Sequence, residues 1–546
     1  MSAVKTYSRV FKPTQLQQAT PQQIQNNAGG YVFEIDDLSY VKRFLILGTE
    51  GGNYYVSEKD LTFQASEKLK SIIESRGKEI VDLIIDVSNK GLAPKNDPAL
   101  YLLALCSNSS DKKVRVHAMV NLWRVARIPT HLYHFVTYLK KIRGFGKVIG
   151  TALEKWFNNK NPLQLAYSLT KYASRDGFSA RDLLRIAKPK SPTEAHNLVY
   201  NYVTITEKQV ANGKKNLIKE NTLYDNEISH KVYSYLRNVE KVKFGSVSDE
   251  ELVSLIRDNN FPMEIIPTDK RTKDVYEAVL NSAGLTWIIR NLGNLSKHGL
   301  LDKDQSDNID KVVSRLGVES QLKSARIHPI NILSALKVYS NGEGYKGSAK
   351  WTPNDKIVEA LNKAFNLSFY NQQSTNKRYY LGLDCSGSMF SSYVNGMEFL
   401  NASEVGGCFA MNILKREEHF IIKGFNKKMQ DININPSSSL KEVLEVMRSV
   451  DWGSTDCSLP IIDAMDRKIP IDVFICITDN ETWSGRLHPF EALKDYRKKM
   501  GINSKLIVLA TSPTKFTIAD PRDPYMLDVA GFSSDVPNII SEFSKI

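Results

Sequence analysis

Apolar residues recur at helical spacing along most of the first 370 residues of the chain. In segment after segment they fall three or four positions apart, which places them on one face of an α-helix. Short polar turns with Gly, Pro, Asn or Asp separate these segments. Such a succession of diverged helix pairs is typical of an α-solenoid, in which neighbouring helices bury each other's apolar faces. Helices are predicted over residues 67–75, 79–89, 98–107, 112–126, 129–141, 147–158, 161–172, 179–187, 274–281, 285–292, 307–316 and 329–339.

Residues 371–546 follow a different pattern, in which short apolar runs alternate with helix-like stretches. A continuous apolar run between polar residues is typical of a buried strand in a parallel sheet. The order of the elements predicts a doubly wound α/β domain of Rossmann-like type. The predicted strands are 379–383, 419–424, 473–478 and 505–510, and the predicted helices are 405–415 and 536–543.

The N-terminal residues fit neither pattern. Residues 1–29 are rich in Gln, Thr and Asn and show no apolar period, so we expect a flexible arm there. At 546 residues the chain is long enough for two or more domains. The predicted organisation is an arm over 1–29, a helical repeat domain over 30–370 and an α/β domain over 371–546.

Positive charge is concentrated in the helical part of the chain. Residues 371–546 carry 20 Lys and Arg against 22 Asp and Glu, a net charge of −2. Residues 1–370 carry 53 against 38, a net charge of +15. Such a one-sided excess of positive charge is typical of proteins that bind polyanions such as nucleic acids. The alternative is a basic surface that only keeps the protein in solution.

Several other features bear on the location of the protein. No run of 18 or more apolar residues suggests a membrane span, and residues 1–12 lack the apolar region of a signal peptide. The five cysteines are scattered and form no CxxC pair, so neither a zinc site nor a disulfide framework is expected. We therefore expect a cytoplasmic protein that does not contact a membrane.

The stretch YYLGLDCSGSM at residues 379–389 carries the most informative chemistry. An apolar run stops at Asp384, and Ser386 and Ser388 follow, so oxygen acceptors stand on alternate residues at the end of a buried strand. Parallel sheets place their ligands beyond the carboxyl ends of the strands. In the alternative interpretation, the serines only cap a helix that begins near Met389.

Two later segments supply further oxygens. The loop 453–456 has the sequence Gly-Ser-Thr-Asp, and the apolar strand 473–478 is followed by Asp479. Hard oxygen ligands of this kind suit Mg²⁺, with Mn²⁺ or Ca²⁺ as alternatives. We therefore predict that three segments converge on a divalent metal ion.

This pattern resembles the metal-ion-dependent adhesion site (MIDAS) of von Willebrand factor A domains. In that family a DxSxS motif, a loop threonine and a later aspartate hold the metal ion. The resemblance implies a metal with one open position for an acidic group of a partner. The implied ligands in this sequence are Asp384, Ser386, Ser388, Thr455 and Asp479.

Two stretches of the helical part are rich in basic residues. By spacing, Lys171 and Arg175 are predicted to share one helix face, and Arg181, Arg185 and Lys188 to share the next. Cations so placed bind phosphates with little sequence preference, and the neighbouring Tyr172 and Phe178 are candidates to stack on bases. The alternative is a solvated face whose cations pair with Asp176 and Asp182. The candidate RNA-binding residues are Arg127, His131, Lys140, Lys141, Lys171, Arg175, Arg181, Arg185 and Lys188.

Motifs along nearly the whole chain are similar to those of the Ro autoantigen family, which combines a TROVE domain with a von Willebrand factor A domain. In the helical part these motifs are Thr49–Tyr55, Arg127–His131, Thr170–Tyr172, Asp182–Arg185, Arg290–Gly293 and Ala325–Pro329. In the α/β part they are Gly453–Pro460, Thr478–Thr482, Tyr496–Met500 and Phe516–Pro521.

The resemblance implies HEAT-like helical repeats that close into a ring, whose two ends are joined by the A domain. It also implies that small noncoding Y RNAs bind the outer surface, where Lys171 and Arg175 match basic residues of the family. Single-stranded 3′ ends of misfolded RNAs would enter the central cavity. Lys188 stands where vertebrate members carry a histidine, which keeps a charge but loses a ring. An exoribonuclease is an implied partner, and ring closure within one chain implies a monomer.

Three classes of function fit these observations. The charge and the resemblance together favour an RNA-binding ribonucleoprotein scaffold in RNA quality control. The alternative is a metal-dependent protein-recognition module, and both functions can occur in one chain. A metal-dependent nuclease is disfavoured because the site offers only two carboxylates, whereas two-metal chemistry needs several. We therefore expect no enzymatic activity.

Overall fold

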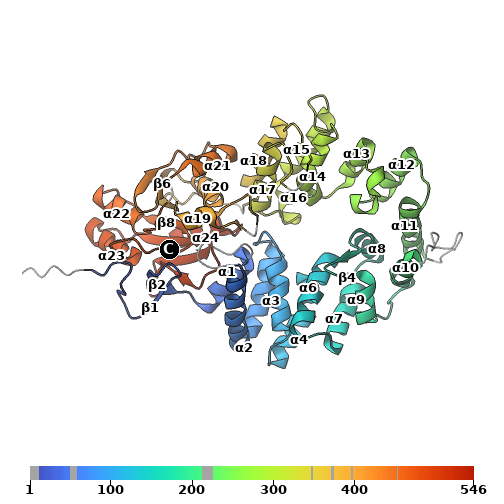
Figure 1. Ribbon diagram of the computed structural model, residues 1–546, viewed down its shortest axis with the longest axis horizontal. Helices are drawn as coiled ribbons and strands as arrows, with labels where there is room; N and C mark the ends of the chain where they lie inside the picture. The colour runs from blue at the N-terminus through green and yellow to red at the C-terminus, as the bar shows by residue number, and fades with distance from the viewer. Residues whose placement is uncertain are drawn as a thin grey trace, which may run out of the picture. The chain divides into compact units, whose positions relative to one another are not determined.

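The computed structural model describes residues 12–49, 58–211, 226–345, 348–369, 374–394, 397–451 and 453–545. These residues form two compact units, one mixed α/β and one helical (Figure 1). The α/β unit contains the described residues up to Lys68, Leu92–Pro94 and the described residues from Phe369 onward. The helical unit contains Leu69–Gly91 and the described residues of Lys95–Ser368.

A six-stranded sheet forms the centre of the α/β unit. Its strands are β5 (Arg378–Asp384), β6 (His419–Phe425), β7 (Met429–Asp431), β8 (Val473–Thr478), β9 (Lys505–Ala510) and β11 (Met526–Ala530). Their order is β11-β9-β8-β5-β6-β7, and all neighbours are parallel except the antiparallel pair of β6 and β7. The four predicted strands are confirmed as β5, β6, β8 and β9. β8 is buried at every residue, which explains why its sequence is apolar without alternation.

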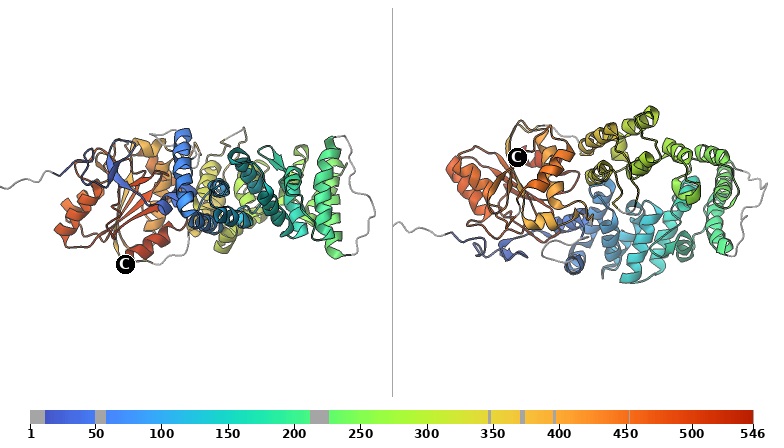
Figure 2. Two further views of the ribbon diagram at one scale, coloured as in Figure 1. Left: turned by 90° about the horizontal axis from the view of Figure 1, so that it is seen from below. Right: turned by 45° about the horizontal axis from the view of Figure 1, so that its top comes forward.

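Helices lie on both faces of this sheet, so the predicted doubly wound fold is confirmed (Figure 2). They are α19 (Gly387–Ser391), α20 (Ala402–Leu414), α21 (Leu440–Ser449), α22 (Leu459–Asp466), α23 (Pro489–Met500) and α24 (Val536–Lys545). On one face, Ile461 of α22 and Leu493 of α23 join Cys476 of β8 in a buried cluster. On the other face α20 approaches β8 closely at Gly406, which has no side chain. A Cβ atom there would lie only 3.2 Å from the side chain of Ile477.

The described residues of the predicted N-terminal arm are an ordered part of the α/β unit, which corrects the prediction for residues 12–29. A second, antiparallel sheet joins β1 (Gln23–Gln25), β2 (Tyr31–Glu34) and β10 (Phe516–Thr517). β2 is the central strand and pairs with β10 from the far end of the sequence. Its residues Val32 and Phe33 are buried, so the segment contributes to a core instead of extending into solvent.

The first helix, α1 (Asp37–Leu47), packs against β11 and is fixed by a buried arginine. Arg43 is 1% exposed and donates to the carbonyl oxygens of Thr514 and Phe516, each at 2.9 Å. Its guanidinium also pairs with the carboxylate of Asp528. A buried charge needs such a complete set of partners, since an unpaired one is costly to bury.

The remaining chain up to residue 369 is almost entirely helical. Its helices are α2 (Glu58–Lys90), α3 (Asp97–Cys106), α4 (Lys112–Val120), α5 (Leu122–Val125), α6 (Pro129–Ile142), α7 (Lys147–Asn158), α8 (Pro162–Lys171), α9 (Ala180–Ala187), α10 (Glu194–Ala211), α11 (Glu227–Phe244), α12 (Asp249–Asn259), α13 (Lys273–Ser282), α14 (Leu285–Lys297), α15 (Ser306–Leu316), α16 (Glu319–Ser324), α17 (Pro329–Ser340) and α18 (Asp355–Leu367). Packed helices are mostly close in the chain, for example α3 with α6, α10 with α11 and α17 with α18. This is the packing expected of an α-solenoid.

Some helix boundaries differ from the prediction. The predicted helices 67–75 and 79–89 are parts of the single helix α2, in which only Arg76 has non-helical angles among the described residues (φ −134°, ψ 21°). The predicted helix 112–126 is divided into α4 and α5 at Asn121. Periodicity alone cannot locate such single-residue irregularities, because the apolar face continues across them.

The two ends of the helical unit contact each other. Arg326, which lies between α16 and α17, donates from Nε to the carbonyl oxygen of Asn89 in α2 at 2.9 Å. Gly91 has a φ of +66°, and a Cβ atom there would lie 3.0 Å from the Cβ atom of Arg326. The beginning and the end of the helical succession are therefore neighbours in space.

Candidate functional site

Asp384 lies at the carboxyl end of β5, a central strand of the sheet, and is 1% exposed. Its Oδ1 atom accepts a hydrogen bond from the backbone N–H of Ser386 at 2.9 Å. Its Oδ2 atom accepts one from the hydroxyl of Thr478 at 2.6 Å. These two bonds fix the orientation of the carboxylate at the edge where strands of a parallel sheet present their ligands.

The two serines of the motif are buried beside Asp384, and their hydroxyl oxygens lie 3.0 Å apart. Ser386 is the N-cap residue of α19, but its side chain makes no capping hydrogen bond there. Helix capping therefore does not explain the motif. The hydroxyls of Ser386 and Ser388 are instead directed toward each other and toward the neighbouring loops.

The other two predicted segments converge on the same point. Gly387 donates from its backbone N–H to the carbonyl oxygen of Gly453 at 3.1 Å, which ties the motif to the loop that carries Thr455. The hydroxyl of Ser388 lies near Asp479, the residue that follows β8, and opposes the rise in the pKa of that carboxyl. The structure thus brings together the segments of all five predicted metal ligands.

We call the five predicted ligands, Asp384, Ser386, Ser388, Thr455 and Asp479, the metal cradle. Two of its oxygens, Oγ1 of Thr455 and Oδ2 of Asp479, have no hydrogen-bond partner among the described residues. Both residues are 1% exposed, and a buried polar atom without a partner is costly. Carboxylate and hydroxyl oxygens are ligands that Mg²⁺ accepts. In the part of the chain that the structure describes, no group of three or more His, Cys, Asp and Glu is placed to hold a metal ion, so a metal at this point would require hydroxyl ligands as well.

The electrostatics of the cradle also suit a cation. Burial, followed by the nearby charge of Asp479, raises the pKa of Asp384 to about 7. Burial likewise raises the pKa of Asp479. Two buried carboxylates that repel each other are both stabilised in their charged form when a divalent cation lies between them.

The sequence analysis did not predict that N-terminal residues contact the loops of this cradle. Residues 12–30, which we call the N-terminal strap, contact the loops that carry Thr455 and Asp479. Gln15 is fully buried and donates from Nε2 to Oδ1 of Asp456 and to the carbonyl oxygen of Leu487, each at 2.8 Å. Asp456 therefore serves to hold the strap and the loop together.

A second contact of the strap lies next to Asp479. Asn26 donates from Nδ2 to the carbonyl oxygens of Asn480 and Thr482 at 3.1 and 2.9 Å. Gly30 lies so close that a Cβ atom on it would be 1.9 Å from the carbonyl oxygen of Thr482. Only glycine fits at this position, because the strap and the loop approach each other backbone to backbone.

The basic surface differs from the prediction in its local geometry. α8 ends at Lys171, and Arg175 lies in a short hairpin of β3 (Ser174–Arg175) and β4 (Phe178–Ser179). The predicted helix face shared by Lys171 and Arg175 is therefore wrong. Asp176 and Gly177 form the turn with φ angles of 51° and 77°, which is the conformation that the sequence Asp-Gly favours in two-residue hairpins. The Asp176-Gly177 dipeptide was the feature of the sequence from which this hairpin could have been predicted.

The hairpin gathers cations around an aromatic ring. Arg175 pairs with Phe178 across the hairpin, and its side chain is 64% exposed. Lys140, from the last turn of α6, lies over the same ring with Nζ 5.7 Å from the centroid. Lys141, the next residue of α6, is exposed. The structure therefore brings residues of the two predicted basic stretches to one surface.

The prediction for the following helix is only partly correct. Arg181 and Arg185 lie in α9, but Lys188 follows its end as a left-handed C-cap residue with a φ of 46°. Asp182 is used to cap α9 together with Ser179, so it is not primarily an ion-pair partner of the arginines. Arg185 and Lys188 are exposed and remain available to a ligand.

Arg127 and His131 have structural roles. Arg127 donates from Nη1 to the carbonyl oxygen and the hydroxyl of Ser88 at 3.1 and 2.6 Å. Burial, followed by the charge of Arg326, lowers the pKa of Arg127 to about 10. Nδ1 of His131 accepts from the backbone N–H of Arg127 at 3.3 Å, and burial lowers the pKa of His131 to about 3. The histidine is therefore neutral and contributes no positive charge to the surface.

A cavity of about 290 Å³ lies beside Lys171. Nζ of Lys171 lies 5.2 Å from the ring centroid of Tyr172 and 5.8 Å from that of Tyr167. The sequence analysis did not single out three further residues that line this cavity, Arg271, Trp287 and Arg290, as ligand-binding candidates. They come from segments about 100 residues further along the chain, so spacing in the sequence could not associate them with Lys171.

Two domain families match the chain: the TROVE domain over residues 24–258 and 263–338, and the Ro60 vWA domain over residues 378–544. The RNA-binding protein RO60 of Deinococcus radiodurans is 34% identical over 549 residues, which cover 99% of this chain and 99% of that protein. The chain belongs to the Ro60 family. The RNA-binding protein RO60 of Caenorhabditis elegans is 33% identical over 601 residues, which cover 97% of this chain and 91% of that protein.

A solved structure of the Ro60 family agrees with this fold. The crystal structure of the Deinococcus radiodurans Ro protein (RSR) matches with a TM-score of 0.68 at 34% identity, covering 93% of this chain and 99% of that one. The resemblance to the Ro family and the predicted combination of helical repeats with a von Willebrand factor A domain are confirmed. Residues 50–55 of the first quoted motif lie outside the described residues. Among the helices that the structure describes, none is long and apolar enough to cross a membrane.

Proposed function

We propose that this protein is an RNA-binding ribonucleoprotein scaffold. The observation that carries the proposal is the similarity over nearly the whole chain to two proteins named RNA-binding protein RO60. In this proposal Y RNAs bind the basic surface of the helical unit, and single-stranded 3′ ends of misfolded RNAs enter the central cavity of a ring of helical repeats. The protein acts as a cytoplasmic monomer in RNA quality control, delivers RNA to an exoribonuclease and is not itself an enzyme.

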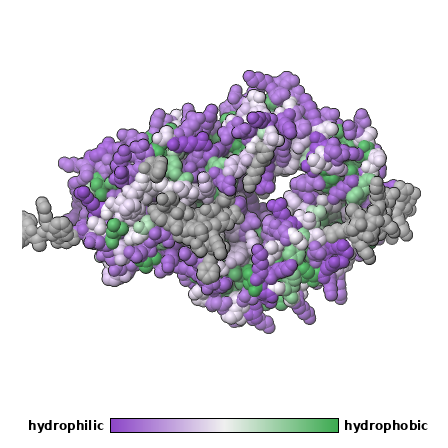
Figure 3. All heavy atoms as spheres, viewed as in Figure 1, coloured by the Kyte–Doolittle hydropathy of each residue, from purple (hydrophilic) through white to green (hydrophobic). Residues whose placement is uncertain are grey.

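The charge distribution supports the assignment of RNA binding to the helical unit. Lys140 and Lys141, Arg175, and Arg185 and Lys188 reach solvent from three neighbouring elements, α6, the β3–β4 hairpin and α9. Hydrophilic residues cover much of the face of the molecule in Figure 3. Contacts of such cations with phosphates supply affinity without reading sequence, and a cavity too narrow for a duplex selects unpaired ends by shape.

The test is binding of a stem-loop RNA with and without a single-stranded 3′ tail, measured for the wild type and for Lys171→Glu/Arg175→Glu. We expect the variant to lose the affinity for the stem-loop by at least about tenfold, since two phosphate contacts become repulsive. The additional affinity that the tail confers should remain. The control is Lys498→Glu/Lys499→Glu, which makes the same charge change on exposed residues of α23. Binding that ignores the tail and falls equally in both variants would contradict the proposal.

We also propose that the cradle binds Mg²⁺, for which Mn²⁺ or Ca²⁺ can substitute. Asp384, Ser386, Ser388, Thr455 and Asp479 are the proposed ligands. The two buried oxygens on Thr455 and Asp479, which have no hydrogen-bond partner among the residues that the structure describes, favour this proposal. When bound, the cation supplies an open coordination position for an acidic group of a protein partner. Metal-dependent protein recognition is therefore the second candidate function, and it is compatible with RNA binding elsewhere in the chain.

A further inference from the structure

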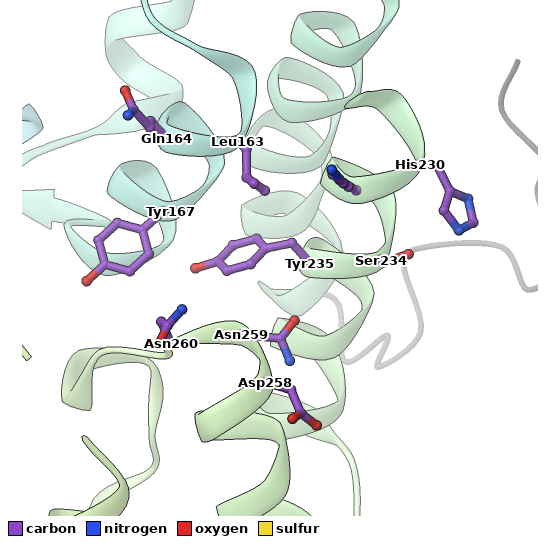
Figure 4. Close-up of a pocket in the computed structure, with 10 residues that line it drawn as sticks. Leu163, Gln164, Tyr167, His230, Ser234, Tyr235, Asp258, Asn259 and Asn260 are labelled. Atoms are coloured by element: carbon purple, nitrogen blue, oxygen red, sulfur yellow. The ribbon is translucent and has the colours of Figure 1, made fainter. Parts of the chain in front are cut away.

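A pocket of about 480 Å³ opens between α8, α11 and α12 of the helical unit (Figure 4). Its size falls within the range of roughly 300–1,000 Å³ that is typical of small-molecule sites. Leu163 and Tyr167 from α8, Tyr235 from α11 and Asn260 after α12 line it. Figure 4 shows the side chains of Tyr167, Tyr235 and Asn260 grouped around one space. None of these residues belongs to the metal cradle or to the predicted basic surface.

Two tyrosine rings form the apolar walls, and both are held in place. Tyr235 is 6% exposed, its hydroxyl oxygen lies 3.2 Å from Oγ1 of Thr170, and its ring packs edge-on against Phe261 with centroids 5.4 Å apart. Tyr167 is half-buried, with Nζ of Lys171 lying 5.8 Å from its ring centroid. Aromatic surfaces that are ordered in advance favour a planar ligand that stacks on them.

Asparagine side chains supply the polar edge of the pocket. The amide of Asn259 is already engaged, since it accepts from Nδ2 of Asn238 at 3.1 Å and donates to the carbonyl oxygen of Leu255 at 2.9 Å. The side-chain amide of Asn260 has no hydrogen-bond partner among the described residues. Asn260 has a φ of 51°, so the end of α12 turns sharply at this residue. A free amide offers donors and an acceptor together, which is the pattern that pairs with the edge of a nucleobase.

This pocket and the adjacent cavity differ in the charged side chains that line them. Asp258 and Lys231 both line the pocket, so no excess of positive charge is present to bind a phosphate there. Beyond Tyr167, Lys171 lines the adjacent cavity of about 290 Å³ together with Arg271 and Arg290. A nucleotide whose base lies against Tyr167 can therefore direct its phosphate toward Lys171.

From this arrangement we infer that the pocket between α8, α11 and α12 binds a nucleobase, which stacks on Tyr167, contacts the accessible edge of Tyr235 and pairs with the amide of Asn260. The base can belong to a free nucleotide or to an RNA strand. The second source rests on the proposed function, because it requires that the helical unit binds RNA.

The experiment uses the full-length protein and titrates it with the four nucleosides, their 5′-monophosphates and ribose 5-phosphate, followed by ligand-observed NMR. Two variants remove the proposed contacts. Tyr167→Ala removes one stacking surface, and Asn260→Gly removes the amide while glycine tolerates the positive φ. Asn376→Gly is the matched control, since this exposed residue of the α/β unit has a φ of 55°. A thermal melt of each variant confirms that it is folded.

We expect at least one nucleoside to bind, with affinity reduced about tenfold or more in Tyr167→Ala and about tenfold in Asn260→Gly. The control variant should bind as the wild type does. Absence of nucleoside and nucleotide binding, or competition by ribose 5-phosphate as effective as that by a nucleotide, would overturn the inference, because the base would then contribute nothing.

A second arm distinguishes the two sources of the base by measuring the affinity for a single-stranded RNA of ten nucleotides. If the base belongs to RNA, both variants weaken this affinity by a similar factor. If only nucleotide binding weakens, the pocket is a site for free nucleotides. Failure of the wild type to bind any RNA would overturn the proposed function, whereas the nucleoside titration would still decide the inference about the pocket.

Discussion

The side-chain oxygens of the metal cradle differ in how many hydrogen bonds they form. Asp384 accepts hydrogen bonds from two donors, whereas Oγ1 of Thr455 and Oδ2 of Asp479 have no partner among the described residues. The motif in the sequence predicted which side chains lie close together at this point. It could not indicate which oxygens are already bonded, because the hydroxyl of Thr478, which bonds to Asp384, comes from another strand. These two oxygens are the atoms that a cation would satisfy.

Addition of Mg²⁺ is therefore expected to raise the melting temperature of the protein. A ligand at 100 times its Kd that binds only the folded state stabilises it by about 2.7 kcal/mol. The gain should be lost in Asp479→Asn and kept in Asp466→Asn, which alters an exposed carboxylate of the same unit. Differential scanning fluorimetry with and without Mg²⁺ measures both. An equal gain in the two variants would show that the ion binds elsewhere.

His131 should make the stability of the protein dependent on pH. Burial lowers its folded-state pKa to about 3, below the unfolded value of about 6.5. The unfolded chain therefore takes up the proton first as the pH falls. The free energy of unfolding should be fully present above pH 6.5 and should decrease toward pH 3, by at most about 1.4 kcal/mol per pH unit from this group.

Urea denaturation at pH 7, 6 and 5 measures this dependence. His131→Asn keeps an acceptor for the N–H of Arg127 and removes the titrating group, so its stability should fall less steeply over this interval than that of the wild type. His419→Asn alters an exposed histidine and should leave the slope unchanged. Parallel profiles for wild type and His131→Asn would refute the assignment of the slope to His131.

Elements with a local signal were predicted well, and elements that depend on distant partners were not. β5, β6, β8 and β9 are apolar runs that end in polar residues, and each was recognised from its own sequence. β2 pairs with β10, from the other end of the chain, and no neighbouring residue indicates that pairing. Residues 1–29 were predicted to be a flexible arm for the same reason, since the amides of the strap bond to carbonyl oxygens that are distant in the sequence.

Removal of the Gln15 side chain tests the contribution of the strap. Gln15→Ala removes the donor to the carbonyl oxygen of Leu487 and one of three donors to Oδ1 of Asp456, which still accepts from the N–H and the hydroxyl of Ser458. We expect a loss on the order of 3 kcal/mol in the free energy of unfolding. The control is Gln25→Ala, an exposed residue of β1, which should cost less than about 0.5 kcal/mol. Urea denaturation of both variants is the measurement. Equal stability of the two would mean that the strap does not support the α/β unit.

For the whole molecule, the uneven charge determines how RNA affinity should respond to salt. The net charge is +15 over residues 1–370 and −2 over residues 371–546, so the proposed phosphate contacts are expected in the first of these two parts. Each phosphate contact with single-stranded RNA contributes about −0.7 to the slope of log K against log salt concentration. The slope therefore counts the cations involved, independently of the absolute affinity.

Arg185→Gln/Lys188→Gln should reduce the magnitude of this slope by roughly 1.4, because two phosphate contacts are lost. Both residues are exposed, so their substitution should leave the fold intact. Fluorescence anisotropy of a labelled single-stranded RNA over a salt series measures the slope. Lys498→Gln/Lys499→Gln on α23 should leave it unchanged. A reduction of the same size in both variants would indicate a general charge effect and not a local contact.

The N-terminal strap has a consequence for the order in which the protein is made. Its residues are synthesised before their partners between Thr455 and His488, roughly 20–90 s earlier at about 5–20 residues per second. During that interval Val32 and Phe33 of β2, which follows the strap directly, lack the core in which they are buried in the folded protein. The many glutamines and asparagines around them keep this waiting segment hydrated, and the same amides later close the α/β unit. We therefore expect the amide-rich composition to matter before the α/β unit folds as well as in the folded protein.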